Sequence, residues 1–258
     1  MSEKHVSYEV QGKIAVVTLQ KAPYNICNRS FYTEIADTFE EISSLEGLSC
    51  VILKSAMKVF CAGGEFQEIQ SIGGMAPEQA YTGANACTRC MASIYGCRYP
   101  VIAAVNGKAI GAGAALAACC DIVIAEEKTV FSVPEVSVGF IGASEFLQLM
   151  LPPRLARYYY FTGKPIPAAE VKAVGGILDV VPAQQLMERV MEVAEELCAV
   201  SPLALRYAKE ALNSNDNARL VEKYMHEYEY TLQFSKSEDY KEAIQAMIDH
   251  RKPAYTGK

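Results

Sequence analysis

The stretch VIAAVNGKAIGAGAALAACCDIVIA, residues 101–125, decides the fold of this chain. Its first five residues, 101–105, are all apolar, which is typical of a buried strand, and the turn at 106–107 ends that strand. The small residues 112–119 then predict a short helix that packs closely against its neighbours. Residues 121–125 predict a second strand. A strand, a close-packed helix and another strand in succession indicate an α/β fold.

The apolar run 109–120 is too short to cross a membrane. As a helix it would extend about 18 Å, whereas the hydrocarbon core of a bilayer is ~30 Å thick. The 258 residues include 24 basic and 30 acidic side chains, a formal charge of −6, and 51% of them are hydrophobic. This composition is typical of a globular protein and argues against nucleic-acid binding, which needs a dense basic surface.

Strand and helix patterns continue on both sides of this stretch. Residues 14–19, 51–53 and 129–133 predict strands. Four apolar residues between the first two strands recur at helical spacing: Phe31, Ile35, Phe39 and Ile42. The alternation of strands with helices again favours an α/β fold.

Helical patterns dominate after about residue 140. They cover 186–197, begin again at Pro202, continue over 220–234, and end with a helix that Ser237 caps and that runs to residue 248. We therefore expect a core at residues 1–200 and a C-terminal helical region at residues 201–258. This tail either packs against a neighbouring subunit or forms a helical layer over its own core.

Nine cysteines are spread along the chain without the spacing of a disulfide framework. The polar N-terminal segment lacks the apolar stretch of a signal peptide, so we expect a reducing, cytoplasmic location. Cys87 and Cys90 form a CxxC pair, which is found in redox and metal sites. No second pair or nearby histidine accompanies it, so the sequence favours cysteines that pack on a helix face, and we expect no metal.

Two glycine-containing loops follow predicted strands, at residues 60–66 and 106–113. Glycine lets a backbone approach a ligand closely, and the start of a helix points free N–H groups outward. Two such N–H groups that converge on one oxygen would form an oxyanion hole. Each loop taken singly is better explained as an ordinary turn that packs closely, because glycines are common in loops. Neither contains a phosphate-binding P-loop or a complete dinucleotide fingerprint.

Glu135 is the one carboxylate in the otherwise uncharged segment FSVPEVSVGF, residues 131–140. Burial would disfavour its ionised form and raise its pKa, which suits a general acid or base. The alternative is a glutamate on the solvent face at the end of a strand.

Five segments in this order resemble the enoyl-CoA hydratase/isomerase family, the crotonases: FCAGGEFQEI (60–69), residues 101–125, FSVPEVSVGF (131–140), YYYFTGKPIPAAEV (158–171) and RKPAYTGK (251–258). The resemblance implies an α/β spiral of ββα units with a C-terminal helical region. It also implies a homotrimer or a hexamer that acts on acyl-CoA thioesters, with coenzyme A as part of the substrate and no separate cofactor, no nucleic acid and no membrane as a partner.

The resemblance also assigns roles to residues. The backbone N–H groups of Gly64 and Ala112 match the family's oxyanion hole, and Glu135 matches its second catalytic glutamate. Ala62 and Gly111 match substrate-binding positions. Arg251 or Lys252, in the last segment, match basic residues that reach the phosphates of coenzyme A.

Ala115 occupies the position where hydratases of the family have their first glutamate, and alanine cannot polarise a water molecule. This departure favours a single-carboxylate reaction, with double-bond isomerisation slightly ahead of hydration or dehydration. Alternatives are a polyketide β-branching dehydratase or decarboxylase on a carrier-protein thioester, or a crotonase-fold binding protein without catalysis. Glu145 is a candidate second acid/base, or a helix-start carboxylate favoured by the helix dipole.

Overall fold

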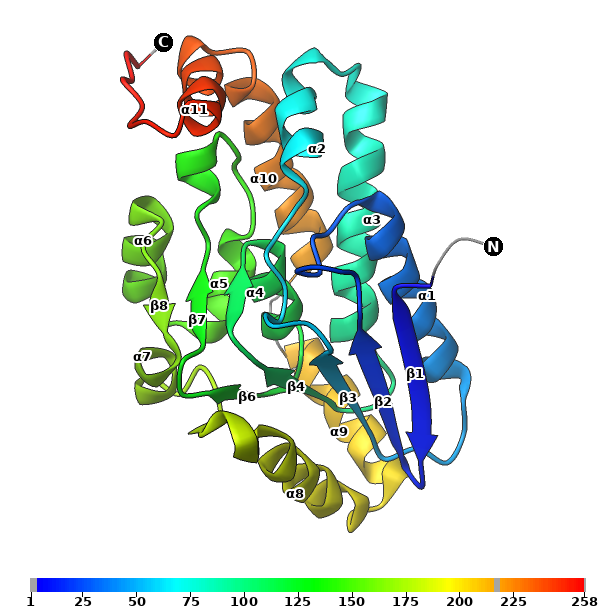
Figure 1. The fold of residues 1–258 in the computed structure, drawn as a ribbon. Helices are drawn as coiled ribbons and strands as arrows, with labels where there is room; N and C mark the ends of the chain where they lie inside the picture. Colours follow the sequence, from blue (N-terminus) through cyan, green and yellow to red (C-terminus); the bar gives the residue numbers. More distant parts are fainter. Residues whose placement is uncertain (1–3, 216–218, 258) are drawn as a thin grey trace.

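Two β-sheets form the centre of the computed structural model, which describes residues 4–215 and 219–257 (Figure 1). The larger sheet has the strand order β1-β2-β3-β4-β6-β9, and all its pairs are parallel except β1–β2. Its strands are β1 Val6–Gln11, β2 Ile14–Leu19, β3 Cys50–Ser55, β4 Val101–Val105, β6 Ile122–Glu126 and β9 Asp179–Val181. The smaller sheet, in the order β5-β7-β8, consists of β5 Lys108–Ile110, β7 Val130–Ser132 and β8 Ile166–Pro167.

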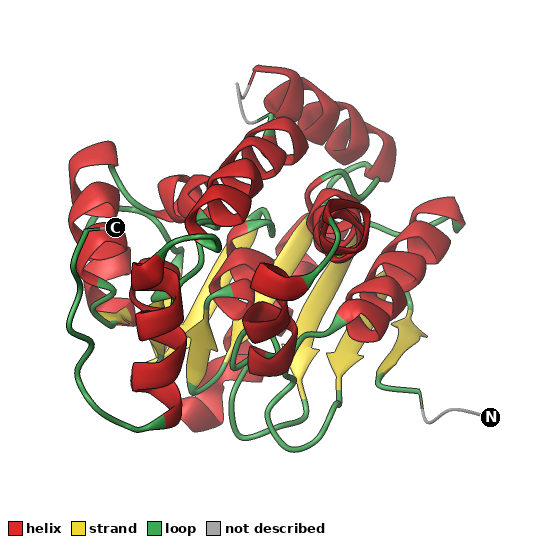
Figure 2. Cartoon of the chain, turned by 90° about the horizontal axis from the view of Figure 1, so that it is seen from above, coloured by secondary structure: helices red, strands yellow, loops and turns green. Residues whose placement is uncertain are grey.

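Helices lie on both sides of the strands (Figure 2). In chain order the α-helices are α1 Arg29–Ser44, α2 Phe66–Ser71, α3 Pro77–Tyr95, α4 Ala112–Ala118, α5 Ser144–Met150, α6 Pro153–Thr162, α7 Ala168–Ala173, α8 Leu186–Cys198, α9 Pro202–Asn215, α10 Leu220–Phe234 and α11 Glu238–Ile248. Three short 3-10 helices are η1 Ile72–Gly74, η2 Glu135–Val138 and η3 Ala183–Gln185.

The parallel strands are apolar on both faces, because each face of the large sheet is covered by helices. Ile52 and Ile102 lie in a small core against α8, whereas their neighbours Val51 and Leu53 lie in the main core with α1 and α3. Successive side chains on a strand point to opposite faces, so continuous apolar runs are the pattern that a sheet between two layers requires.

Helix α10 of the C-terminal helical region packs against α3 and α5 of its own chain (Figure 1). Its residues Leu220, Tyr224 and Tyr228 belong to the main core, and the Tyr228 hydroxyl donates a hydrogen bond of 3.0 Å to the carbonyl of Ala80. The predicted helical tail therefore covers its own core. Its contact with other subunits stays a prediction.

A buried lysine holds α9 against the large sheet. The Nζ atom of Lys209 lies 2.7 Å from a carboxylate oxygen of Asp121 and 3.1 Å from the carbonyl oxygen of Tyr99. The same Asp121 oxygen accepts the N–H of Val101 at 2.7 Å. Because the Lys209 side chain is only 5% exposed, its ammonium group depends on these partners for the hydrogen bonds that water would otherwise supply.

Several sequence predictions are confirmed in detail. Strands 14–19 and 101–105 and helix 220–234 have the predicted ends, and the Ser237 side chain caps α11 by accepting the N–H of Tyr240. Strands β1, β5, β8 and β9 were not predicted, since most are short and β5 lies inside a segment that we expected to be a loop. None of the helices in the described ranges is long and apolar enough to cross a membrane.

Replacing Lys209 with methionine should lower the free energy of unfolding by about 1–3 kcal/mol, because the carbonyl of Tyr99 and the partly exposed carboxylate of Asp121 lose the ammonium group that they share. Chemical denaturation measures this change. Lys241→Ala, which removes a well-exposed ion pair with Glu238, is the control and should cost less than about 1 kcal/mol. Equal effects of the two substitutions would contradict a stabilising role for the Lys209 pair.

Candidate active site

The loop at residues 61–64 is held beside the start of α4 by backbone contacts. Cys61 pairs with Ala109 of β5, and Gly64 pairs with Cys27. Gly113, in the first turn of α4, faces the carbonyl of Cys61 so closely that a Cβ atom on it would lie 2.4 Å from that oxygen. Only glycine permits this approach, so the sequence itself sets the distance between the loop and the helix.

Two backbone N–H groups at this junction are unused. The pairing of Gly64 with Cys27 uses the carbonyl of Gly63 and the N–H of Glu65, which leaves the N–H of Gly64 on the opposite side of the strand. Ala112 is the first residue of α4, where no carbonyl of the helix can accept its N–H. Within the described parts of the chain neither group has an acceptor, and both residues line one cavity.

The cavity has a volume of about 160 Å³. It lies between the loop, α4, and helices α1, α2, α3, α5 and α10. Most of its surface is apolar. The apolar side chains that line it include Ile72, Met75, Ala80, Ala84, Met91, Ala115, Phe140 and Phe146.

Glu135, the first residue of η2, contributes its carboxyl group to the same cavity. The residue is 9% exposed, and its Oε2 atom is buried without a hydrogen-bond partner among the described residues. Its Oε1 atom lies against Gly111, where an added Cβ would come within 2.5 Å. Gly111 also has a φ of +53°, so two separate constraints require glycine at the position just before α4.

Burial raises the pKa of Glu135 from 4.5 to about 8. The main cause is the loss of hydration of the carboxylate, and the nearby negative charge of Glu227 adds to it. A hydrogen bond from the backbone N–H of Glu135 to its own carboxyl group lowers this pKa, but by less than burial raises it. A carboxyl group with a pKa close to neutral can both accept and return a proton, which is the property of a general acid/base.

Ala115, at the position where hydratases of the family have their first glutamate, lies in the cavity wall. Ala115 is buried on α4 and lines the cavity with Glu135. Two carboxylates that sequence reasoning missed, Glu65 and Glu68, also line it, together with Arg29. Glu68 accepts the N–H of Arg29 at 3.3 Å. The GGEFQE segment contains both glutamates, and its strand-to-helix boundary was the signal that could have identified them.

Glu145 does not line this cavity. It lies in the first turn of α5 and forms an ion pair of 2.8 Å with Lys223 of α10. The neighbouring Glu227 accepts the N–H of Ser144 at 3.3 Å and also the Ser144 hydroxyl, so it caps the start of α5. The helix-start interpretation of Glu145 agrees with this placement.

Neither of the two predicted substrate-binding positions is among the described residues that line the cavity. Gly111 contacts Glu135, as described above. Ala62 lies within the loop at residues 61–64, donates its N–H to the carbonyl of Tyr24 at 3.0 Å, and does not line the cavity formed by the described residues.

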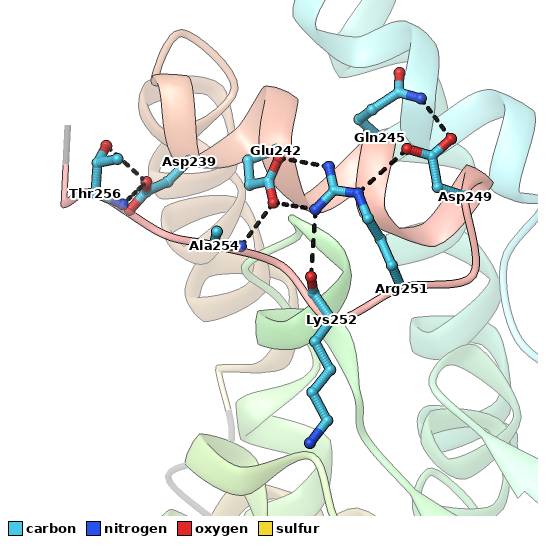
Figure 3. Close-up of polar contacts among 8 residues, drawn as sticks. All are labelled: Asp239, Glu242, Gln245, Asp249, Arg251, Lys252, Ala254 and Thr256. Atoms are coloured by element: carbon cyan, nitrogen blue, oxygen red, sulfur yellow. Dashed lines mark hydrogen bonds and ion pairs between the residues drawn. The ribbon is translucent and has the colours of Figure 1, made fainter.

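Arg251 is tied to the C-terminal helix α11 (Figure 3). Its guanidinium group pairs with Glu242 at 2.5 Å and with Asp249 at 3.2 Å. Lys252 extends away from these groups in the same view, and no acidic side chain in the described ranges pairs with it. Of these two cationic side chains, Arg251 is therefore paired with carboxylates, and Lys252 has no acidic partner among the described residues.

All nine cysteines are free thiols, and eight of them are buried. Cys61 lies in the loop at residues 61–64, and its sulfur atom is 3.5 Å from that of Cys27. Cys87 and Cys90 both lie buried on α3, as the helix-face interpretation predicted. In the ranges that the structure describes, no group of three His, Cys, Asp or Glu side chains is arranged to hold a metal ion.

Comparison with known proteins extends the sequence resemblance over nearly the whole chain. The profile of the enoyl-CoA hydratase/isomerase family matches residues 9–258. A Mycobacterium tuberculosis protein, (7aS)-7a-methyl-1,5-dioxo-2,3,5,6,7,7a-hexahydro-1H-indene-carboxyl-CoA hydrolase, is 32% identical over 86% of this chain and 89% of its own. The 2,3-dehydroadipyl-CoA hydratase of Escherichia coli is 28% identical over the full length of both chains.

Solved structures agree with this relationship. The crystal structure of carnitinyl-CoA hydratase from Mycobacterium avium superimposes with a TM-score of 0.81 and 27% identity over the full length of both chains. The crotonase fold predicted from the sequence segments is confirmed. The chain belongs to the enoyl-CoA hydratase/isomerase family, and it is an enzyme of acyl-CoA thioesters.

Substituting alanine for Gly113 should separate α4 from the Cys61 loop, because the new Cβ atom would overlap a backbone oxygen. We expect a loss of stability of about 1–3 kcal/mol, measured by thermal or chemical unfolding. Gly83→Ala is the matched control, since it lies within helix α3 with no atom within 4 Å of the added Cβ. That substitution should stabilise the protein by up to about 1 kcal/mol, and a stabilising Gly113→Ala would contradict the close contact.

Proposed function

We propose that the protein catalyses proton transfer on an enoyl-CoA thioester through an enolate, with double-bond isomerisation as the reaction. The observation that carries this proposal is the single buried carboxyl group of Glu135, which shares one cavity with the unused N–H groups of Gly64 and Ala112. The three groups have complementary tasks. One moves a proton, and the other two stabilise the negative charge that the transfer creates.

In this reaction the thioester oxygen accepts hydrogen bonds from the N–H groups of Gly64 and Ala112. The carboxylate of Glu135 removes a proton from C2 of a 3-enoyl group, and the electron pair spreads over the dienolate to the thioester oxygen. The resulting carboxylic acid returns the proton at C4, which moves the double bond to C2. Atoms and charge balance, and the glutamate ends in its starting state.

Isomerisation fits this cavity better than hydration does. Hydratases of the family use a first glutamate on α4, beside the equivalent of Glu135, to position and deprotonate water, and this chain has Ala115 at that position in the cavity wall. The mostly apolar lining gives a water molecule few partners. Isomerisation needs one group only, because the same carboxyl acts first as base and then as acid.

Hydrolysis is a second candidate, supported by the 32% identity to a protein of Mycobacterium tuberculosis that is named an indene-carboxyl-CoA hydrolase. The form of hydrolysis that would use the two N–H groups breaks a carbon–carbon bond and forms an enolate. In such a reaction Glu135 would take a proton from water as the oxygen attacks a ketone in the acyl group. The bond between the ketone carbon and C2 then breaks, its electron pair forms the thioester enolate, and Glu135 returns the proton to C2. The enolate needs the same two N–H groups.

Replacing Glu135 with glutamine should lower the rate of deuterium exchange at C2 of an enoyl-CoA by about 10²- to 10⁴-fold, because the amide cannot accept the proton. Binding of the thioester should remain. Glu145→Gln is the matched control outside the cavity and should exchange at the wild-type rate. Exchange that survives Glu135→Gln would contradict the role of Glu135, and absence of exchange in the wild type would contradict the enolate reaction.

The pH dependence follows from the direction of the pKa shift. Glu135 acts as a base only when it is ionised, and its pKa of about 8 means that the ionised fraction grows as the pH rises to that value. We therefore expect kcat/KM of the wild type to rise tenfold per pH unit below about pH 8 and to level off above it. A profile already level at pH 6 would contradict a desolvated base.

Product analysis by mass spectrometry and NMR separates the remaining reactions. A mass unchanged from the substrate indicates isomerisation, and the addition of one water indicates either hydration or carbon–carbon hydrolysis, which NMR of the product distinguishes. The same acyl groups attached to an acyl carrier protein, tested beside the CoA thioesters, check the carrier-protein alternative.

A further inference from the structure

Three polar side chains from three different helices meet in the otherwise apolar cavity. They are Tyr32 of α1, Cys87 of α3 and Tyr224 of α10, and all three line the cavity. Each is buried, with exposures of 8%, 6% and 7% respectively. We refer to these three residues as the Tyr32–Cys87–Tyr224 cluster.

The two hydroxyl groups of this cluster lack strong partners. Neither forms a hydrogen bond to a nitrogen or oxygen atom within the part of the chain that the structure describes. Both interact with the Cys87 thiol, and their hydrogen bonds partly offset the rise in its pKa that burial causes. Sulfur is a weak acceptor, so each hydroxyl can form a stronger hydrogen bond to an oxygen in the cavity.

The hydroxyl groups remain protonated and therefore act as donors. Burial raises the pKa of both Tyr32 and Tyr224 well above the ordinary value of 10.0. Tyr228, which lines the same cavity, differs from them because its hydroxyl is already bound to the carbonyl of Ala80. Only Tyr32 and Tyr224 therefore present unsatisfied phenol donors among the cavity tyrosines.

A purely hydrocarbon acyl group would leave these donors facing apolar atoms. Buried polar groups without a hydrogen-bond partner are unfavourable, and buried tyrosine hydroxyls normally have one. Apolar side chains of the cavity wall, such as Ile72, Met91 and Phe146, provide no oxygen or nitrogen atom, and no side-chain oxygen or nitrogen among the described residues accepts a hydrogen bond from either hydroxyl. The missing acceptor is best supplied by the ligand itself.

The charges around the cluster indicate that this acceptor is neutral. Glu135 is close enough that its negative charge raises the pKa of both Cys87 and Tyr224. Arg29 is the one cationic side chain among the described residues of the cavity wall, and it contacts Glu68 of α2 through its backbone. A carboxylate at the cluster would therefore face repulsion from the ionised form of Glu135, the form that acts as the base, without a dedicated cation.

We propose that the Tyr32–Cys87–Tyr224 cluster binds a neutral oxygen of the acyl group, a ketone or a hydroxyl, and that the substrate is therefore an oxygenated acyl-CoA. This inference rests on the proposed function, since it takes the cavity to be the acyl site. The two tyrosines are specificity-determining residues here, and the proton transfer still belongs to Glu135. A site that donates hydrogen bonds to a substrate oxygen discriminates strongly against an analogue that lacks it.

Octanoyl-CoA and three analogues with a ketone at the fourth, fifth or sixth carbon provide the test. The dissociation constant and the rate of deuterium exchange at C2 are measured for each thioester. We expect the wild type to bind at least one ketone analogue about tenfold or more tightly than octanoyl-CoA. Tyr32→Phe and Tyr224→Phe should each reduce this preference several-fold and leave octanoyl-CoA binding unchanged, which also shows that the variants are folded.

Tyr81→Phe, on α3 outside the cavity wall, is the control and should keep the wild-type preference. Equal binding of octanoyl-CoA and all three ketones by the wild type would overturn the inference, as would variants that weaken every thioester equally. Exchange at C2 reports separately on the proposed function. A ketone preference that depends on Tyr32 and Tyr224, in the absence of any exchange, would support the cluster and contradict the enolate reaction.

Discussion

Gly113 allows the backbone of α4 to meet the carbonyl of Cys61 with no side chain between them. Cys61 lies three residues before Gly64, and Gly113 directly follows Ala112. The contact between Cys61 and Gly113 therefore controls the distance between the two unused N–H groups. The pairing of Cys61 with Ala109 and of Gly64 with Cys27 holds the loop on its other sides. The donors are thus positioned by packing of small residues before any ligand binds, which is the condition for electrostatic stabilisation of an enolate.

The same close packing determines the chemistry of Glu135. Its carboxyl group lies against Gly111 and inside an apolar cavity, so loss of hydration raises its pKa to about 8. Because the folded-state pKa exceeds that of the unfolded chain, the protonated form contributes stability at low pH, and this contribution is lost as the pH rises toward 8. A reactive carboxyl group in this position therefore has a cost in stability at alkaline pH.

Much of the fold and part of the candidate site could be predicted from the sequence, because local patterns carry that information. The loops with Gly64 and Ala112 and the isolated Glu135 each stand out within a short segment, and the structure brings them to one cavity. Tyr32, Cys87 and Tyr224 show no such signal. They lie on three helices far apart in sequence, where each fits an ordinary apolar face, and the packing of α1 and α10 on α3 brings them together.

Infrared difference spectroscopy of Glu135 tests the desolvated single carboxyl group most directly. Spectra of the wild type and of Glu135→Gln are compared over a pH titration, and the carbonyl band of a protonated carboxyl that is absent from the variant is assigned to Glu135. The structure predicts that this band is present at neutral pH and disappears with a midpoint at about pH 8. A midpoint close to the ordinary value of 4.5 would show a hydrated carboxylate and would contradict the buried acid/base.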